Sequence, residues 1–98
     1  MKKLSDLLAG IKIKSIEGDT DKLVAGITDN SREVKNDFLF FAIHGNKFDG
    51  HDFIDKSIKR GSNTIICTKL PKGLNEKITY ILVEDIRESV YRISSNFY

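Results

Sequence analysis

The sequence contains a single cysteine, Cys67, a single proline and no tryptophan among its 98 residues. One cysteine excludes an intrachain disulfide, and its apolar surroundings suit a buried, inert thiol in a reducing compartment. Acidic and basic residues are nearly balanced, 14 against 16, and both signs are spread along the chain. This balance argues against a nucleic-acid or membrane partner. Because no apolar stretch of about 18 residues occurs, we expect neither a membrane span nor a signal peptide, and we expect a cytoplasmic protein.

The length of 98 residues fits one domain and excludes a two-domain enzyme, since single domains commonly run to roughly 100–150 residues. Apolar residues make up 40% of the chain, which is enough to close a core and argues against long disorder. The last predicted helix runs almost to the final residue, with no loop after it. We therefore expect this chain to be a fragment of a longer protein.

Hydrophobic periodicity predicts an alternation of strands and helices along the chain. Apolar runs predict strands at residues 11–14, 23–27, 38–43, 63–68 and 79–83. Apolar stripes at helical spacing predict helices at residues 3–9, 50–60 and 86–97. The run 38–43 is nearly continuous in apolar residues, which favours a central strand covered on both faces. This order predicts an α/β fold, a single small domain with a mostly parallel or mixed β-sheet flanked by helices.

Two polar loops, 28–37 and 44–51, each follow a predicted strand. Ligands of open α/β sheets bind beyond the carboxyl ends of strands, so both loops are candidate sites for a polar, partly anionic small molecule. The first loop contains Asp29, Asn30, Ser31 and Arg32, and the second contains His44, Asn46, Lys47, Phe48 and His51. Turn chemistry is an alternative interpretation of both loops. For Asp49, Gly50 and His51 we favour that structural role, turn and helix start, over catalysis.

No set of catalytic residues emerges from the sequence. His44 and His51 stand seven positions apart with one distant cysteine, a spacing that matches no zinc pattern, so no metal site is predicted. The chain contains no G-x-x-x-x-G-K-[ST] phosphate loop, no G-x-G-x-x-G motif and no nucleophile with an evident base. The residues alone predict a small α/β binding domain.

Four motifs in fixed order nevertheless carry a resemblance to a known family. They are the runs 30–34 (NSREV), 37–45 (DFLFFAIHG), 49–54 (DGHDFI) and 57–62 (SIKRGS). In this order and spacing they resemble the N-terminal domain of the Mur ligase family, over about residues 20–98. The closing run 95–98 (SNFY) is similar to the aromatic end of that domain in ligases of the MurE type.

The resemblance implies a fold and a function for all of residues 1–98. In this family the N-terminal domain holds the uridine diphosphate end of UDP-MurNAc-dipeptide, a cell-wall precursor. A central domain binds ATP and magnesium, and a C-terminal domain presents the incoming amino acid; both are absent from this chain. The full-length protein would be an ATP-dependent ligase that adds the third peptide residue in peptidoglycan synthesis by forming an amide bond. We expect the fragment alone to be inactive, without cofactor, and monomeric.

The resemblance also assigns roles to individual residues. Ser31 aligns with the serine that hydrogen-bonds the nucleotide, and Asp29 precedes it as a backbone contact. The loop that contacts uracil and ribose aligns with Asn46, Lys47 and Phe48. Supporting roles fall to Asn30, Arg32, Asp49, Gly50 and His51.

This chain departs from the family pattern at two positions. Asn30 replaces the usual aspartate, so a neutral amide or neighbouring Asp29 must order the loop through Arg32. Asn36 stands where the family usually has glycine, and we expect it to make the turn in left-handed geometry. A MurF-type ligase remains an alternative within the family. An alternative of another class is a non-catalytic module that binds protein or nucleic acid, suggested by the basic residues Lys2, Lys3, Lys12, Lys14, Lys56, Lys59 and Arg60.

Overall fold

The computed structural model describes residues 1–45 and 47–98 and contains a five-stranded mixed sheet with the strand order β2-β7-β6-β5-β4. Four strands are parallel: β4 (Gly26–Thr28), β5 (Phe38–Phe41), β6 (Thr64–Cys67) and β7 (Thr79–Val83). The edge strand β2 (Ile13–Glu17) runs antiparallel to β7. Separately, β1 (Lys2–Lys3) pairs with β3 (Leu23–Val24) in a small antiparallel ribbon. The predicted α/β class with a mostly parallel sheet is confirmed.

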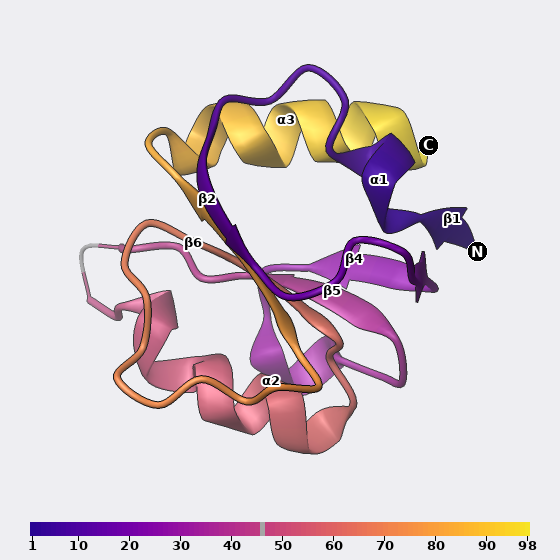
Figure 1. The fold of residues 1–98 in the computed structure, drawn as a ribbon. Helices are drawn as coiled ribbons and strands as arrows, with labels where there is room; N and C mark the ends of the chain where they lie inside the picture. The colour runs from indigo at the N-terminus through magenta and orange to yellow at the C-terminus, as the bar shows by residue number, and fades with distance from the viewer. Residues whose placement is uncertain (46) are drawn as a thin grey trace.

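Helices cover both faces of the sheet, as Figure 1 shows. On one face lie α1 (Leu4–Leu7) and α3 (Ile86–Phe97), and on the other lie α2 (Ile54–Arg60) and two 3₁₀ turns, η1 (Ser31–Glu33) and η2 (Gly50–Phe53). The parallel strands send alternate side chains into two buried clusters. In β5, Leu39 and Phe41 pack under α3, whereas Phe40 packs on the α2 side. This double coverage explains why the strand sequences are nearly continuous in apolar residues.

Two predicted strands differ from those observed. The strand predicted at 11–14 instead begins at Ile13 and continues to Glu17, with a register shift between Ile13 and Ser15. The strand predicted at 23–27 is divided at Ala25 into β3 and β4, which belong to different sheets. A Cβ on Gly26, directly after the break, would lie 2.5 Å from the ring of Phe38, so glycine at this position leaves room for that ring. The strand predicted to be central, β5, is internal, while the middle position belongs to β6.

Capping residues in the sequence lie at the observed ends of two helices, but one predicted helix differs in extent from the observed one. Asp85 caps α3, its Oδ1 accepting the backbone N–H of Glu88 at 3.1 Å, and Gly61 ends α2 with a φ of 121°. The predicted helix 50–60 starts as the 3₁₀ turn η2 before it becomes α2.

The residue with left-handed backbone geometry in the turn before β5 is Asp37, with a φ of 64°, and not Asn36 as predicted. Two backbone hydrogen bonds hold Asp37 there. Its N–H donates to Gly61 O and its carbonyl accepts the N–H of Ala25, each at 2.8 Å. The turn is therefore fixed by tertiary partners that the local sequence does not contain.

None of the helices formed by the described residues is both long and apolar enough to cross a membrane.

Candidate functional site

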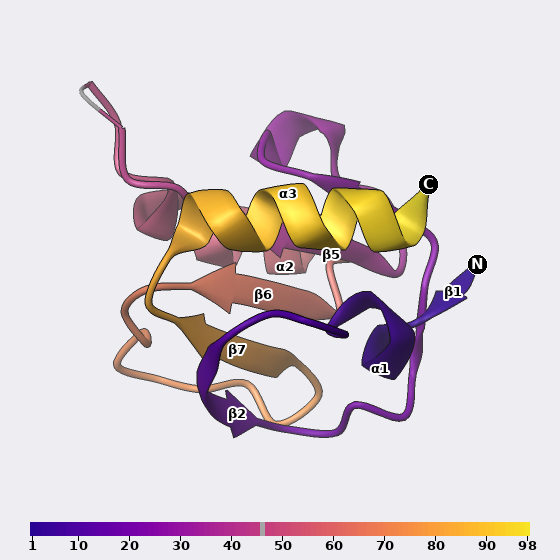
Figure 2. The same ribbon diagram turned by 90° about the horizontal axis from the view of Figure 1, so that it is seen from above.

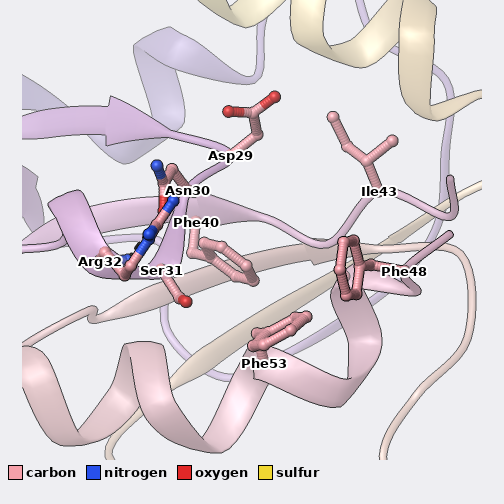
Figure 3. Close-up of a pocket in the computed structure, with 9 residues that line it drawn as sticks. Asp29, Asn30, Ser31, Arg32, Phe40, Ile43, Phe48 and Phe53 are labelled. Atoms are coloured by element: carbon pink, nitrogen blue, oxygen red, sulfur yellow. Dashed lines mark hydrogen bonds between the residues drawn. The ribbon is translucent and has the colours of Figure 1, made fainter.

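A pocket of about 520 Å³ lies beyond the carboxyl ends of β4 and β5. Figure 3 shows the side chains that line it. They come from the two loops predicted as candidate sites, from β5 and the residues just after it, and from η2. The lining residues are Asp29, Asn30, Ser31, Arg32, Phe40, Ile43, Phe48, Gly50 and Phe53. One wall is polar, residues 29–32, and the opposite wall is mainly aromatic, so the pocket is suited to a ligand with a flat ring and polar substituents.

The polar wall is ordered by hydrogen bonds between near neighbours in the chain. Oδ1 of Asn30 accepts the backbone N–H of Arg32 at 3.0 Å and lies 3.5 Å from Nε of the same residue. Thr28 supports the turn from the other side, since its Oγ1 accepts the N–H of Asn30 and donates to Glu33, each at 3.0 Å. The neutral amide of Asn30 therefore orders the loop through Arg32, in the place of the family's aspartate.

Ser31 begins η1 and is only 9% exposed, yet it lines the pocket. Its hydroxyl group forms no hydrogen bond with any described residue. Hydrogen bonds formed by Thr28 and Asn30 order the backbone on either side of Ser31, so the position of its Cβ is fixed. The hydroxyl group can still form hydrogen bonds with a ligand. It is suited to donate to, or accept from, a polar ligand.

The aromatic wall consists of Phe40, Phe48 and Phe53. Phe48 and Phe53 meet edge to face, with ring centroids 6.3 Å apart and an interplanar angle of 67°. Phe48 is 70% exposed, an unusual degree of exposure for a phenylalanine, while Phe40 is buried at the end of β5. Phe40 and Phe53 were not among the predicted site residues, because they lie in the apolar segments 38–43 and 50–60, whose patterns predict a buried strand and a helix. The alternation along β5 places Phe40 on the α2 side, a signal that could have identified it.

Phe48 is carried by a hairpin between β5 and η2, described at residues 44–45 and 47–49. His44 pairs with Asp49 in an isolated bridge, and Gly45 N–H donates to Phe48 O at 2.8 Å. Gly50 closes the base, donating its N–H to Ile43 O at 2.7 Å. Gly50 allows the close approach of two backbone segments, because a Cβ there would overlap the backbone of Ile43.

The hairpin brings together only part of the predicted loop site. Phe48 lines the pocket, whereas Lys47 is exposed and is not among the lining residues. Asn46 lies outside the described residues. The predicted contacts of Lys47 and Asn46 with a ligand therefore remain predictions.

Asp49 and His51 do not line the pocket; they order the base of the hairpin that carries Phe48. Oδ1 of Asp49 accepts the backbone N–H of His51 at 3.0 Å and lies 2.7 Å from its ring Nδ1. These two contacts, the backbone one first, lower the pKa of Asp49 from 3.8 to about 2. The hydrogen bonds agree with the turn and helix-start role favoured for Asp49 and His51 from the sequence.

Within the described part of the chain, no group of three or more His, Cys, Asp or Glu side chains is placed to hold a metal ion. Cys67 is buried in β6, and this burial raises the pKa of its thiol to about 11, so it stays protonated and inert at neutral pH. The geometry of the described residues supports binding of a ligand in this pocket.

Most of the chain matches a known protein family. A sequence model described as "Mur ligase family, catalytic domain" matches residues 23–98. The chain belongs to the Mur ligase family. The prediction from the four motifs is thereby confirmed at the level of the family.

Several curated Mur ligases align with nearly the whole chain. A UDP-N-acetylmuramoyl-L-alanyl-D-glutamate--2,6-diaminopimelate ligase of Clostridium acetobutylicum is 40% identical over 96 residues, 98% of this chain and 20% of that protein. A ligase with the same activity in its name from Phocaeicola vulgatus is 36% identical, with the same coverage. A UDP-N-acetylmuramyl-tripeptide synthetase of Borrelia garinii is 39% identical over 102 residues, 99% of this chain and 20% of that protein. The chain thus spans about a fifth of the length of these Mur ligases.

Solved Mur ligase structures share the fold. A crystal structure of MurF from Acinetobacter baumannii superposes with a TM-score of 0.78 over 96% of this chain and 20% of its own length. Its sequence identity is 19%, so this likeness concerns the fold alone. MurF from Thermotoga maritima, in complex with ADP, gives a TM-score of 0.61 and 31% identity over 69% of this chain and 15% of that protein.

Proposed function

We propose that this chain is the N-terminal, nucleotide-binding domain of a MurE-type ligase, and that it holds the uridine diphosphate end of UDP-MurNAc-dipeptide while the third peptide residue is added in peptidoglycan synthesis. The observation that carries the proposal is the pocket beyond β4 and β5, with a polar wall at residues 29–32 facing an aromatic wall. The names of the curated relatives, diaminopimelate ligases and tripeptide synthetases, support the MurE type over the MurF type.

The walls suit the two halves of a nucleoside. A uracil ring can pack against Phe48 and Phe53, whose edge-to-face arrangement leaves an aromatic face open to the pocket. Ser31 and the backbone around Asp29 can hydrogen-bond the ribose or the polar edge of the base. A volume of about 520 Å³ matches a small-molecule site, commonly about 300–1,000 Å³. The pocket is open, so other domains of the ligase would supply further contacts and exclude water.

ATP and magnesium belong to the proposed full-length ligase, and the residues of this chain do not fit them. The sequence has no phosphate loop ending in Gly-Lys-Ser or Gly-Lys-Thr, and the described residues form no cluster of metal ligands. The activation of the substrate carboxylate therefore involves residues outside this chain. We expect the isolated domain to fold, to act as a monomer in the cytoplasm, and to turn over no ATP.

An NMR titration of the isolated domain with UDP-MurNAc-dipeptide, and with UDP alone, tests the proposal. We expect saturable chemical-shift changes in the amides of residues 29–32 and 44–49, with weak affinity because the rest of the ligase is absent. No shifts at millimolar ligand, or shifts confined to other surfaces, would refute the site. A steep salt dependence of DNA binding in the same preparation would instead support the interaction module considered from the sequence.

A further inference from the structure

The hairpin that carries Phe48 extends from the body of the domain. Figures 1 and 2 show the chain on both sides of residue 46 running outward between β5 and α2. Its internal contacts are local: the bridge of His44 with Asp49 and the hydrogen bond from Gly45 to Phe48. A short two-stranded hairpin is marginally stable by itself in water. Its position against the pocket must therefore come from contacts with the rest of the domain.

His51 makes such a contact on each side of its imidazole ring. Nδ1 lies 2.7 Å from Oδ1 of Asp49, at the base of the hairpin. Nε2 accepts the backbone N–H groups of Thr68 and Lys69, at 3.2 and 3.3 Å, in the connection that follows β6. The ring is buried, its side chain being 9% exposed. His51 thus joins two segments that are separated in sequence and adjacent at the same edge of the sheet.

The partners of the ring fix its tautomer. Asp49 is ionised near neutral pH, because its pKa is lowered to about 2, so its Oδ1 can only accept and the proton must lie on Nδ1 of His51. Two N–H donors face Nε2, which must therefore present its lone pair. One neutral tautomer satisfies both sides.

We propose that His51 is a positioning residue of the nucleotide site: its Nδ1–H tautomer connects the Phe48 hairpin to the connection after β6 and so fixes the aromatic wall before the ligand binds. The inference rests on the proposed function for its ligand, but the connection itself is a property of the free domain. A hairpin held in place loses less conformational freedom on binding, so the connection raises affinity without touching the nucleotide.

Two substitutions of His51 test the contacts of Nδ1 and Nε2 separately. In His51→Asn the side-chain amide can still donate to Asp49, but it is too short to reach the amides of Thr68 and Lys69. In His51→Gln the longer side chain brings an acceptor oxygen to the place of Nε2. Asp52→Asn is the matched control, because Asp52 follows His51 directly, is exposed, and forms no side-chain hydrogen bond with a described residue.

Amide hydrogen exchange and UDP titration of the four proteins form the experiment. We expect His51→Asn to exchange the Thr68 and Lys69 amides at least about tenfold faster, to loosen the Phe48 amide in ¹⁵N relaxation, and to weaken UDP binding about three- to tenfold. His51→Gln should return exchange and affinity to within about threefold of the unsubstituted domain, and Asp52→Asn should leave both unchanged. The ¹⁵N shifts of the His51 ring should show the Nδ1–H tautomer.

The outcomes distinguish this inference from the proposed function. If the unsubstituted domain binds no UDP, the proposed function fails, and so does the role of His51 in binding. If UDP binds but the Asn and Gln variants behave alike in exchange and affinity, the nucleotide site stands and the positioning role is wrong. An Nε2–H tautomer in the free domain would also overturn the inference.

Discussion

The two walls of the pocket are built in different ways. The polar wall at residues 29–32 is held by hydrogen bonds between Thr28, Asn30, Arg32 and Glu33, all within a few positions of one another. The aromatic wall depends on Phe48, on a hairpin whose position relies on Gly50 packing on Ile43 and on His51 reaching Thr68. The polar wall has one longer tertiary hydrogen bond, from Arg60 Nη1 to Arg32 O at 3.4 Å, so it is ordered mainly by local contacts, whereas the aromatic wall depends on tertiary contacts. Substitutions should be able to disturb each wall separately.

The largest effect should come from Gly50→Ala, which acts on the aromatic wall. The added Cβ would overlap backbone atoms of Ala42 and Ile43, which cannot move as a flexible side chain can. We expect a loss of about 1–3 kcal/mol in the free energy of unfolding, measured by urea denaturation, together with weaker UDP binding. Gly73→Ala is the control, since nothing lies within 4 Å of the added atom, and it should be close to neutral. Equal stability of the two variants would contradict the close packing.

Asn30→Ala should disturb the polar wall and leave the hairpin unchanged. It removes the acceptor that caps η1, a loss that costs about 1 kcal/mol at comparable positions. Thermal denaturation measures the cost, and the amide shifts of residues 44–49 report on the hairpin. Asn30→Asp, which restores the aspartate of the family pattern and keeps an acceptor, should recover most of the stability. If Asn30→Asp is as unstable as Asn30→Ala, the cap is not what Asn30 contributes.

Ser31→Ala should change binding rather than folding. The Ser31 hydroxyl forms no hydrogen bond with a described residue, so its loss should leave the melting temperature nearly unchanged. If the hydroxyl bonds the nucleotide, its loss should cost about 0.5–1.5 kcal/mol, roughly two- to tenfold in the Kd for UDP. Isothermal titration calorimetry gives the affinity. An unfolded Ser31→Ala domain would show instead that the 28–32 loop is structural.

The smallest effect should appear in the acid range, through Asp49 at the base of the hairpin. Folding lowers the pKa of this carboxyl from 3.8 to about 2, so its ionised form stabilises the folded state. This stabilisation is complete above about pH 4 and is lost as the pH falls toward 2. The difference in stability between the unsubstituted domain and Asp49→Asn should therefore be constant near neutral pH and shrink below pH 4. A constant difference down to pH 2 would contradict the lowered pKa.

The same contrast explains what the sequence could predict. The presence of the strands β5, β6 and β7 along the chain, the Asp85 cap and the two loops after β4 and β5 followed from local patterns of apolar, polar and capping residues. The break at Ala25 and the left-handed Asp37 did not follow, because each depends on partners at positions 37, 38 and 61.

The same distinction between local patterns and distant partners applies to the residues of the site. Asn30 and Ser31, which lie in one short motif, were predicted and do line the pocket, whereas Phe40 and Phe53 line it without having been predicted. Whether a phenylalanine is buried against the sheet or lines a pocket depends on what lies opposite it. The contact of His51 with Thr68 joins segments 17 positions apart, which no motif in either segment indicates.

The antiparallel edge strand β2 has a consequence for synthesis on the ribosome. Strands β4, β5 and β6 can pair in the order in which they emerge, but β2 pairs only with β7, for example Ile16 with Ile81. Strand β2 must therefore wait, unpaired, until most of the domain has been translated, and its pairing then closes a long loop at an entropic cost. Until it does so, β7 remains an open sheet edge that another nascent chain could join.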